Sequence, residues 1–127
     1  MPLNTINPTQ TAAWQKLEAH FAQVKGLKMQ DLFAADANRA EQFHIEWQDF
    51  LLDFSKNRIT AETMQLLQEL ATEVQLKNAI DKYFAGDLIN QTEQRAVLHT
   101  ALRAAAGQEI LVDGQDVMTE IQAVKQK

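Results

Sequence analysis

The spacing of apolar residues changes near Thr60, and this change constrains the fold more than any other feature of the chain. Before it, Phe43, Ile45 and Trp47 alternate with polar residues, which is the pattern of a strand with one buried face. After it, apolar residues recur every three or four positions, as on one side of an amphipathic helix. The sequence therefore predicts a β-hairpin over about 43–54, followed by helices.

The predicted hairpin has an amphipathic pattern and a weak turn signal. Gln48-Asp49 connects its two strands and lacks the glycine of the strongest two-residue turns. A hairpin alone is only marginally stable in water, so this one must pack on helices or pair with further strands.

Capping residues divide the remainder of the chain into helices. Side-chain oxygens of Ser, Thr, Asp and Asn cap helix starts, and glycine commonly follows a helix end. The predicted elements are a loose arm over 1–8, a helix from Thr9 or Thr11 to Gly26, one or two turns over 29–33, a short segment capped by Asp36, helices from Thr60 to Val74 and from Leu76 to Gly86, a helix over 92–105 capped by Thr92 and ended by Gly107, a β-prone run over 110–112 closed by Asp113-Gly114, and a last helix capped by Asp116.

Apolar residues at helical spacing mark the faces expected to point inward. They are Trp14, Leu17, Phe21 and Val24, then Met64, Leu67, Leu70, Ala71 and Val74, then Leu76, Ile80, Tyr83 and Phe84, then Val97, Leu98, Ala101 and Leu102, and finally Val117, Ile121 and Val124. The predicted fold class is therefore mainly α with a small antiparallel β-hairpin (α+β), and 127 residues are enough for one domain.

Composition argues against several kinds of site and partner. There are no cysteines, which excludes thiol catalysis, disulfides and zinc–thiolate sites. The net charge of −5 and the scattered basic residues argue against nucleic acid and membrane surfaces as partners. The first residues lack a secretory pattern, and no apolar run approaches the roughly 20 residues that span a bilayer. The sequence therefore predicts a cytoplasmic protein.

Two groups of residues have spacings that suggest a site. His44 and Glu46 would share one strand face and could begin a metal or acid–base site, but the alternation makes that face the solvent-exposed one. Arg95, His99 and Arg103 recur every four residues, which would place them on one helical face able to bind a phosphate or carboxylate. A solvated polar face or a subunit contact explains this second group better.

The remaining patterns indicate no chemistry. His20 is far in sequence from the other histidines and lacks metal-ligand spacing. Asn90-Gln-Thr92 matches a glycosylation sequon by chance, because no signal peptide is recognised, and Thr92 is expected to cap a helix. The turn over 55–58 (Ser-Lys-Asn-Arg) could hold an anion, and a plain hairpin-to-helix connection explains it equally well. The residues themselves predict no catalytic, cofactor-binding or metal-binding position.

The order and identity of several segments go beyond these physical signals. Over about residues 12–125, nearly the whole chain, the sequence resembles the N-terminal part of the phosphoglucose isomerase family, the glucose-6-phosphate isomerases. The segments that carry the resemblance are Leu32-Phe33 with Asp36 and Arg39, Leu51–Thr60, Phe84–Gly86, Ile89-Asn90, Thr92-Glu93, Arg95–Arg103 and Ile110–Gly114.

The resemblance implies a parent enzyme of glycolysis and gluconeogenesis, a homodimeric aldose–ketose isomerase that interconverts glucose 6-phosphate and fructose 6-phosphate through an enediol. It implies no metal or redox cofactor. In the family, the phosphate-binding loop, base glutamate, ring-opening histidine and lysine and active-site arginine belong to later segments. The resemblance thus makes 1–127 a single N-terminal domain fragment without the catalytic α/β domains, inactive alone.

Two functional interpretations remain open at this point. The chain is an N-terminal structural domain whose partners are the remaining domains of the isomerase, or a free-standing helical interaction module derived from that domain. A gene that continues past Lys127 into Gly-Gly-Ser-Asp favours the first, and a stop codon there favours the second. A small independent enzyme using His44 with Glu46, or the Arg95 group, is disfavoured.

The resemblance also predicts an incomplete surface. A segment taken from a larger protein should expose apolar area that neighbouring domains would cover. The residues expected to contribute are Phe50, Leu51, Phe54 and 110–112, because hairpin edges and short β-prone runs seek further partners.

Overall fold

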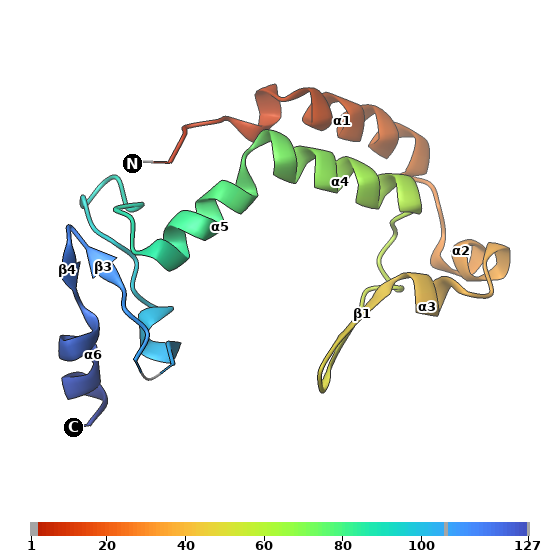
Figure 1. The fold of residues 1–127 in the computed structure, drawn as a ribbon. Coiled ribbons are helices and arrows are strands. Elements are labelled where there is room, and N and C mark those ends of the chain that lie inside the picture. Colours follow the sequence, from red (N-terminus) through yellow and green to blue (C-terminus); the bar gives the residue numbers. More distant parts are fainter. Residues whose placement is uncertain (1–2, 106, 127) are drawn as a thin grey trace. The chain divides into compact units, whose positions relative to one another are not determined.

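The computed structural model describes residues 3–105 and 107–126, which form two compact units (Figure 1). The first unit comprises Pro8–Leu70, and the second comprises the chain from Ala71 onward together with the segment before Pro8. Helices predominate in both, with a small antiparallel hairpin in the first, so the predicted α+β class is confirmed. None of the described helices combines the length and the apolar content needed to cross a membrane.

The first unit begins with a 3₁₀ turn, Pro8–Gln10, and helix α1, Ala12–Val24. Thr11 is the cap: its hydroxyl oxygen accepts a hydrogen bond from the Trp14 amide at 3.2 Å and donates one to the Pro8 carbonyl at 2.7 Å. The predicted start is therefore confirmed at the second of the two proposed threonines.

Helix α4, Ala61–Glu73, lies antiparallel to α1 (Figure 1). Lys16 pairs with Glu69 at 2.8 Å, and His20 Nε2 contacts the Thr63 hydroxyl at 2.7 Å. Position 16 thus faces 69 while position 20 faces 63, so the two helices run in opposite directions. The start of α4 at Thr60 is as predicted, but the buried residue is Leu66, and Leu67, predicted to face inward, is exposed.

Two short helices connect α1 to the hairpin: α2, Met29–Ala35, and α3, Arg39–Gln42. Asp36 was predicted to cap the second of these. Its carboxylate accepts a hydrogen bond from the Asn38 amide at 2.9 Å, one residue before the helix begins, so it forms an Asx turn and Asn38 takes the cap position.

The predicted hairpin is confirmed as β1, His44–Trp47, and β2, Phe50–Asp53. The register pairs Ile45 with Leu52 and Trp47 with Phe50, and Gln48, the first turn residue, has a φ of 54°. Because paired residues share a sheet face, Ile45, Trp47, Phe50 and Leu52 form one apolar face. His44 and Glu46 lie on the opposite face with Leu51 and Asp53.

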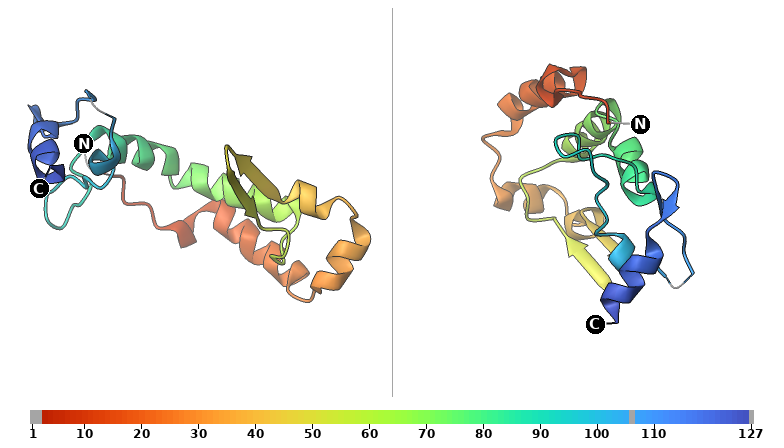
Figure 2. Two further views of the ribbon diagram at one scale, coloured as in Figure 1. Left: turned by 90° about the horizontal axis from the view of Figure 1, so that it is seen from below. Right: turned by 90° about the vertical axis from the view of Figure 1, so that its left-hand side faces the viewer.

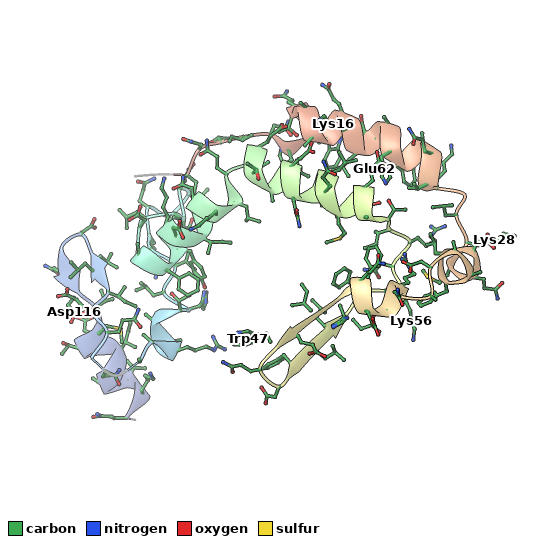
Figure 3. The ribbon with its side chains drawn as sticks, turned by 45° about the vertical axis from the view of Figure 1, so that its right-hand side comes forward. Lys16, Lys28, Trp47, Lys56, Glu62 and Asp116 are labelled. Atoms are coloured by element: carbon green, nitrogen blue, oxygen red, sulfur yellow. The ribbon has the colours of Figure 1, made fainter. Side chains whose placement is uncertain are left out.

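This apolar face is exposed, with Trp47 at 63% and Phe50 at 68% of full exposure. Figure 3 shows Trp47 at the tip of the hairpin. The exposure predicted for Phe50 and Leu51 is confirmed. Phe54 is half-buried instead, because its ring packs edge-on against buried Phe43 with centroids 5.9 Å apart.

In the second unit, helix α5 spans Leu76–Ala85 and ends at Gly86 as predicted. Gln75 separates it from α4 by adopting a left-handed conformation, with φ at 57°. Gly86 also has positive φ, 81°, and its amide bonds back to the Lys82 carbonyl. The two helical stripes of the sequence are therefore separate helices, although no glycine lies between them.

The helix predicted over 92–105 is wrong. The chain forms a turn at 91–94 closed by an Asn90–Arg95 bridge, and only Ala101–Arg103 is helical, as a 3₁₀ turn. Gln94 has a φ of 52°, which an α-helix does not tolerate. Thr92 does not cap a helix here: its hydroxyl donates to Asn90 Oδ1, which also accepts from the Glu93 amide.

A second hairpin, absent from the prediction, follows: β3, Leu111–Val112, and β4, Gln115–Asp116 (Figure 2). Asp113 and Gly114 both have positive φ, 51° and 78°, the requirement of a type I′ turn. Asp-Gly is a strong hairpin signal, but it was expected here only to end the β-prone run over 110–112. The last helix, α6, spans Met118–Lys125. Asp116, predicted as its cap, accepts a hydrogen bond from the Met118 amide at 3.0 Å in an Asx turn, and Val117 takes the cap position.

The second unit has a small core of Ala101, Ile110 and Met118, against which Leu98, Ala104, Val117 and Ile121 pack. Ile110 was predicted to be exposed and is buried; Leu111 is exposed as predicted, and Val112 is half-buried. Side chains point alternately along a strand, so a run of three apolar residues cannot present one face. Several residues predicted to face inward are exposed: Phe21, Leu76, Ile80, Phe84, Leu102 and Val124.

Candidate functional site

His44 and Glu46 are neighbours on the polar face of the hairpin, as the alternation predicts. His44 Nε2 lies 3.9 Å from Glu46 Oε1, and its Nδ1 is 3.0 Å from the Ala40 carbonyl oxygen. The Glu46 side chain is 75% exposed. Within 3–105 and 107–126, no group of three potential ligands is arranged to hold a metal ion. This pair is therefore a solvent-facing contact with no further ligand around it.

Arg95, His99 and Arg103 do not share a helical face, because the helix that would align them is absent. Arg95 belongs to the Asn90 turn and pairs with Glu93 at 3.6 Å. His99 precedes the 3₁₀ turn, and Arg103 ends it. The structure instead brings His99 and Arg103 together with Tyr83 at one pocket, and leaves Arg95 outside that pocket.

The 55–58 turn is organised around a cation, Arg39, and does not form an anion nest. The Arg39 guanidinium is almost fully buried and donates to three backbone carbonyls, those of Ser55 at 2.8 Å, Asn57 at 2.8 Å and Ile59 at 3.0 Å. An anion at this turn would have to displace these carbonyl oxygens from the Arg39 guanidinium. The hairpin-to-helix connection is thus the structural role of the segment.

Two aromatic rings complete the Arg39 site. The guanidinium carbon lies 4.5 Å from the centroid of Phe43 and 5.6 Å from that of Phe33. Such cation–π contacts favour a buried guanidinium over an ammonium, because its flat surface can stack while its edge donates. Its three carbonyl partners lie 16–20 residues away, so no local sequence pattern identifies the role of Arg39.

Asp53 closes the hairpin end next to this turn. Hydrogen bonds from Ser55, first its hydroxyl and then its backbone amide at 2.8 Å, lower the pKa of the Asp53 carboxyl from its ordinary value. A carboxyl whose pKa is lower in the folded state stabilises the fold above its unfolded pKa and loses that effect as the pH falls through the folded value. Asp53 is therefore an ionised structural group at neutral pH and unsuited to proton donation.

His20 is the buried histidine of the described chain. Its Nε2 contacts the Thr63 hydroxyl at 2.7 Å and the Thr60 hydroxyl at 3.5 Å, where these threonines cap α4 by bonding to each other's amides. Its Nδ1 lies 3.4 Å from Glu62 Oε2 and makes no hydrogen bond with any described residue. Figure 3 shows Glu62 at the start of α4, on the side of α1. His20 therefore fastens α1 to the start of α4.

The contacts of Arg39, Asp53 and His20 hold neighbouring parts of the first unit together. Proton transfer needs a base within hydrogen-bond reach of the reacting carbon, and acyl or phosphoryl chemistry needs a nucleophile beside a base. Across the described residues, the polar contacts reported above serve to hold α1, α4 and the hairpin in place.

The comparisons with known proteins give a consistent family. The family model described as phosphoglucose isomerase matches residues 53–127. A curated protein described as glucose-6-phosphate isomerase, from Christiangramia forsetii, is 51% identical over 125 residues, which is 98% of this chain and 23% of that relative. The chain therefore spans about a quarter of the length of the curated relative that it matches.

Proposed function

Since the chain belongs to the phosphoglucose isomerase family, we propose that it is the N-terminal structural part of a glucose-6-phosphate isomerase. In this proposal, the complete enzyme interconverts glucose 6-phosphate and fructose 6-phosphate as an aldose–ketose isomerase in the cytoplasm. This segment contributes a scaffold for that enzyme and no reacting group.

The observation that carries the proposal is the exposed apolar face of the β1–β2 hairpin. Ile45 and Leu52 form one cross-strand pair on it and Trp47 and Phe50 the next, with the two rings 5.9 Å apart. A hairpin normally buries this face, because two strands alone are marginal in water. An exposed patch of this kind marks a binding surface, and we assign the remaining polypeptide of the isomerase as its occupant.

The size of the missing partner supports this assignment. The matched relative is about four times as long as this chain, because the alignment covers 23% of it. Burying each partly exposed Trp, Phe, Leu or Ile adds on the order of 1 kcal/mol or more. Four such side chains on one face give an interface strong enough to order the hairpin against a neighbouring domain.

The chemistry of the proposed reaction explains why the segment alone should be inactive. After the sugar ring opens, a carboxylate must move a proton between C2 and C1 through an enediol, and clustered donors must hold the phosphate. The family places those groups in later segments. Glu93 does line a hollow with Arg95 and His99, but that carboxylate pairs with Arg95 at 3.6 Å.

The test is complementation between two polypeptides. We expect the chain alone to convert fructose 6-phosphate at the rate of a no-enzyme control, and the remaining isomerase polypeptide to gain at least about tenfold activity when the chain is added. The double variant Trp47→Ser/Phe50→Ser should lose this gain. Glu46→Ser, on the opposite hairpin face, is the matched control and should keep it.

Two results would overturn the proposal: conversion by the purified chain alone, or a remaining polypeptide that is fully active without it. Reading the gene beyond Lys127 adds an independent check. An open frame that continues into the catalytic segments agrees with the proposal, whereas a stop codon would favour a free-standing interaction module.

The same apolar face predicts self-association of the isolated chain. Without its proposed partner, the hairpin face should bind a second copy, so sedimentation velocity should show a mass that rises with concentration. Trp47→Ser/Phe50→Ser should shift the chain toward monomer, and Glu46→Ser should not. A strictly monomeric chain at high concentration would contradict this expectation and strengthen the interaction-module alternative.

A further inference from the structure

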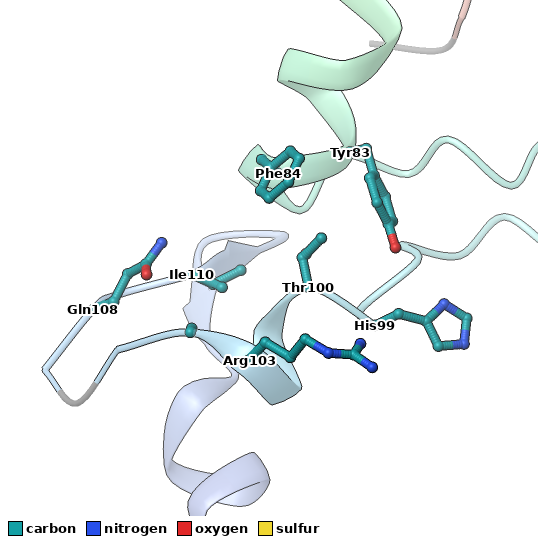
Figure 4. Close-up of a pocket in the computed structure, with 8 residues that line it drawn as sticks. Tyr83, Phe84, His99, Thr100, Arg103, Gln108 and Ile110 are labelled. Carbon is teal, nitrogen blue, oxygen red and sulfur yellow. The ribbon is translucent and has the colours of Figure 1, made fainter. Parts of the chain in front are cut away.

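A small pocket lies in the second unit where the end of α5 meets the segment around the 3₁₀ turn Ala101–Arg103 (Figure 4). Tyr83 and Phe84 line it from the helix, and His99, Thr100 and Arg103 from the turn. Its volume is about 270 Å³, enough for a small organic anion and too small for a macromolecular segment.

The polar groups that line this pocket can all donate hydrogen bonds. They are the Arg103 guanidinium, the His99 imidazole, the hydroxyls of Tyr83 and Thr100, and the Gln108 amide, and no carboxylate is among the lining residues. The chain as a whole has a net charge of −5, yet this pocket is lined by hydrogen-bond donors and by no carboxylate, so it suits an anionic ligand. Figure 4 shows the Arg103 side chain directed to the same end of the pocket as His99 and the hydroxyl of Tyr83.

The charge of Arg103 has no carboxylate partner among the described residues. Some other cations do have one, for example Lys77 with Asp81 at 2.8 Å and Arg95 with Glu93 at 3.6 Å. Among residues 3–105 and 107–126, Arg103 and His99 form no such pair. An arginine that remains unpaired beside a cavity is available to bind an oxyanion from solution.

The pocket wall is held by the core of the second unit. Ile110 lines the pocket and is buried with Ala101 and Met118. Phe84 supplies an apolar wall, and its ring packs against that of Tyr83 with centroids 5.6 Å apart. An apolar wall near several hydrogen-bond donors suits a ligand with one charged end and a short carbon body.

From this arrangement we propose that the Tyr83–His99–Arg103 pocket binds the phosphate group of a small organic phosphate. The planar fork of Arg103 can hold two phosphate oxygens, while the imidazole and the two hydroxyls approach from other directions, as a tetrahedral dianion requires. Phe84 and Ile110 contact the carbon body. The site binds and carries no reacting group, and it does not depend on the function proposed for the hairpin.

The experiment uses the 127-residue chain and two probes, inorganic phosphate and glycerol 3-phosphate, followed by NMR at constant ionic strength. We expect saturable shifts of His99 and Arg103 signals with both probes, and none with equivalent sodium chloride. Arg103→Gln should weaken binding about tenfold or more, because it removes the charge and the fork. Arg103→Lys should fall between Gln and wild type, because a single ammonium keeps the charge without the fork.

Arg95→Gln is the matched control, since Arg95 is exposed, pairs with Glu93 and lies outside the pocket. It should leave the affinity unchanged, and circular dichroism should show the same fold for all variants. Shifts that never saturate, or an equal loss in Arg95→Gln and Arg103→Gln, would overturn the site. Glycerol 3-phosphate binding more than about tenfold weaker than inorganic phosphate would overturn the assignment to an organic phosphate.

Discussion

Replacing Arg39 with alanine is expected to lower the free energy of unfolding of the first unit by about 3–5 kcal/mol. The guanidinium donates to three backbone carbonyls and lies over two aromatic rings, so one truncation removes five contacts. A hydrogen bond from a charged donor contributes about 1.5–3 kcal/mol, and a buried carbonyl left without a donor adds a further penalty. A loss of this size is a large part of the stability of a small domain.

Urea unfolding followed by circular dichroism measures this effect as a lower midpoint. Arg58→Ala is the matched control, because Arg58 is exposed and its hydrogen bond to a described residue, the Lys25 carbonyl, is long at 3.4 Å. It should change the free energy of unfolding by less than about 0.5 kcal/mol. Arg39→Lys should recover only part of the loss, since one ammonium cannot reach three carbonyls in a plane. Equal midpoints for Arg39→Ala and Arg58→Ala would show that the carbonyl cluster contributes little.

Gly86→Ala is expected to destabilise the second unit by about 2–4 kcal/mol, through two separate causes. Gly86 has a φ of 81°, and an L-residue with a side chain is strained there by about 1 kcal/mol or more. In addition, an added Cβ would lie 2.9 Å from the Leu111 carbonyl oxygen and 3.2 Å from Ile110 Cγ2. The backbone of β3 would have to move, which disturbs the core around Ile110.

Gly114→Ala separates these causes, because Gly114 has a φ of 78° but no atom within 4 Å of an added Cβ. It should cost about 1 kcal/mol, the strain alone. Gly26→Ala, with neither positive φ nor a neighbour, should be neutral or slightly stabilising. Thermal or urea unfolding of the three variants should therefore rank them in that order, and similar losses at Gly86 and Gly114 would disprove the close contact with β3.

Sequence reasoning succeeded where a local signal decides the structure. The Thr11 cap, the alternation over 43–54, the start of α4 at Thr60 and the glycine at the end of α5 were all predicted. Each depends on residues within one turn or one strand pair, so the interacting residues are close together in the sequence. The second hairpin was not predicted, although Asp113-Gly114 is a typical hairpin turn, because its strands are only two residues long.

Sequence reasoning failed where local and tertiary preferences compete. Residues 92–105 have helical spacing, but Asn90 holds the preceding turn through its side chain and Gln94 is left-handed. Leu98, Ala101 and Ala104 reach the core around Ile110 and Met118 from a 3₁₀ turn and irregular chain instead. The packing of that core outweighed the helical period, and the predicted face of Arg95, His99 and Arg103 disappeared with it.

By itself the sequence determined the helical class, the first hairpin and the family, because these depend on short-range order or on residue identity. Only the tertiary structure decided that Arg39 gathers the carbonyls of 55–59, that His99 joins Arg103 and Tyr83 at a pocket, and that the apolar hairpin face stays uncovered within this chain. The physical reason is that the spacing of apolar residues indicates which side chains will be buried. The element against which they pack lies far along the chain, and the spacing does not identify it.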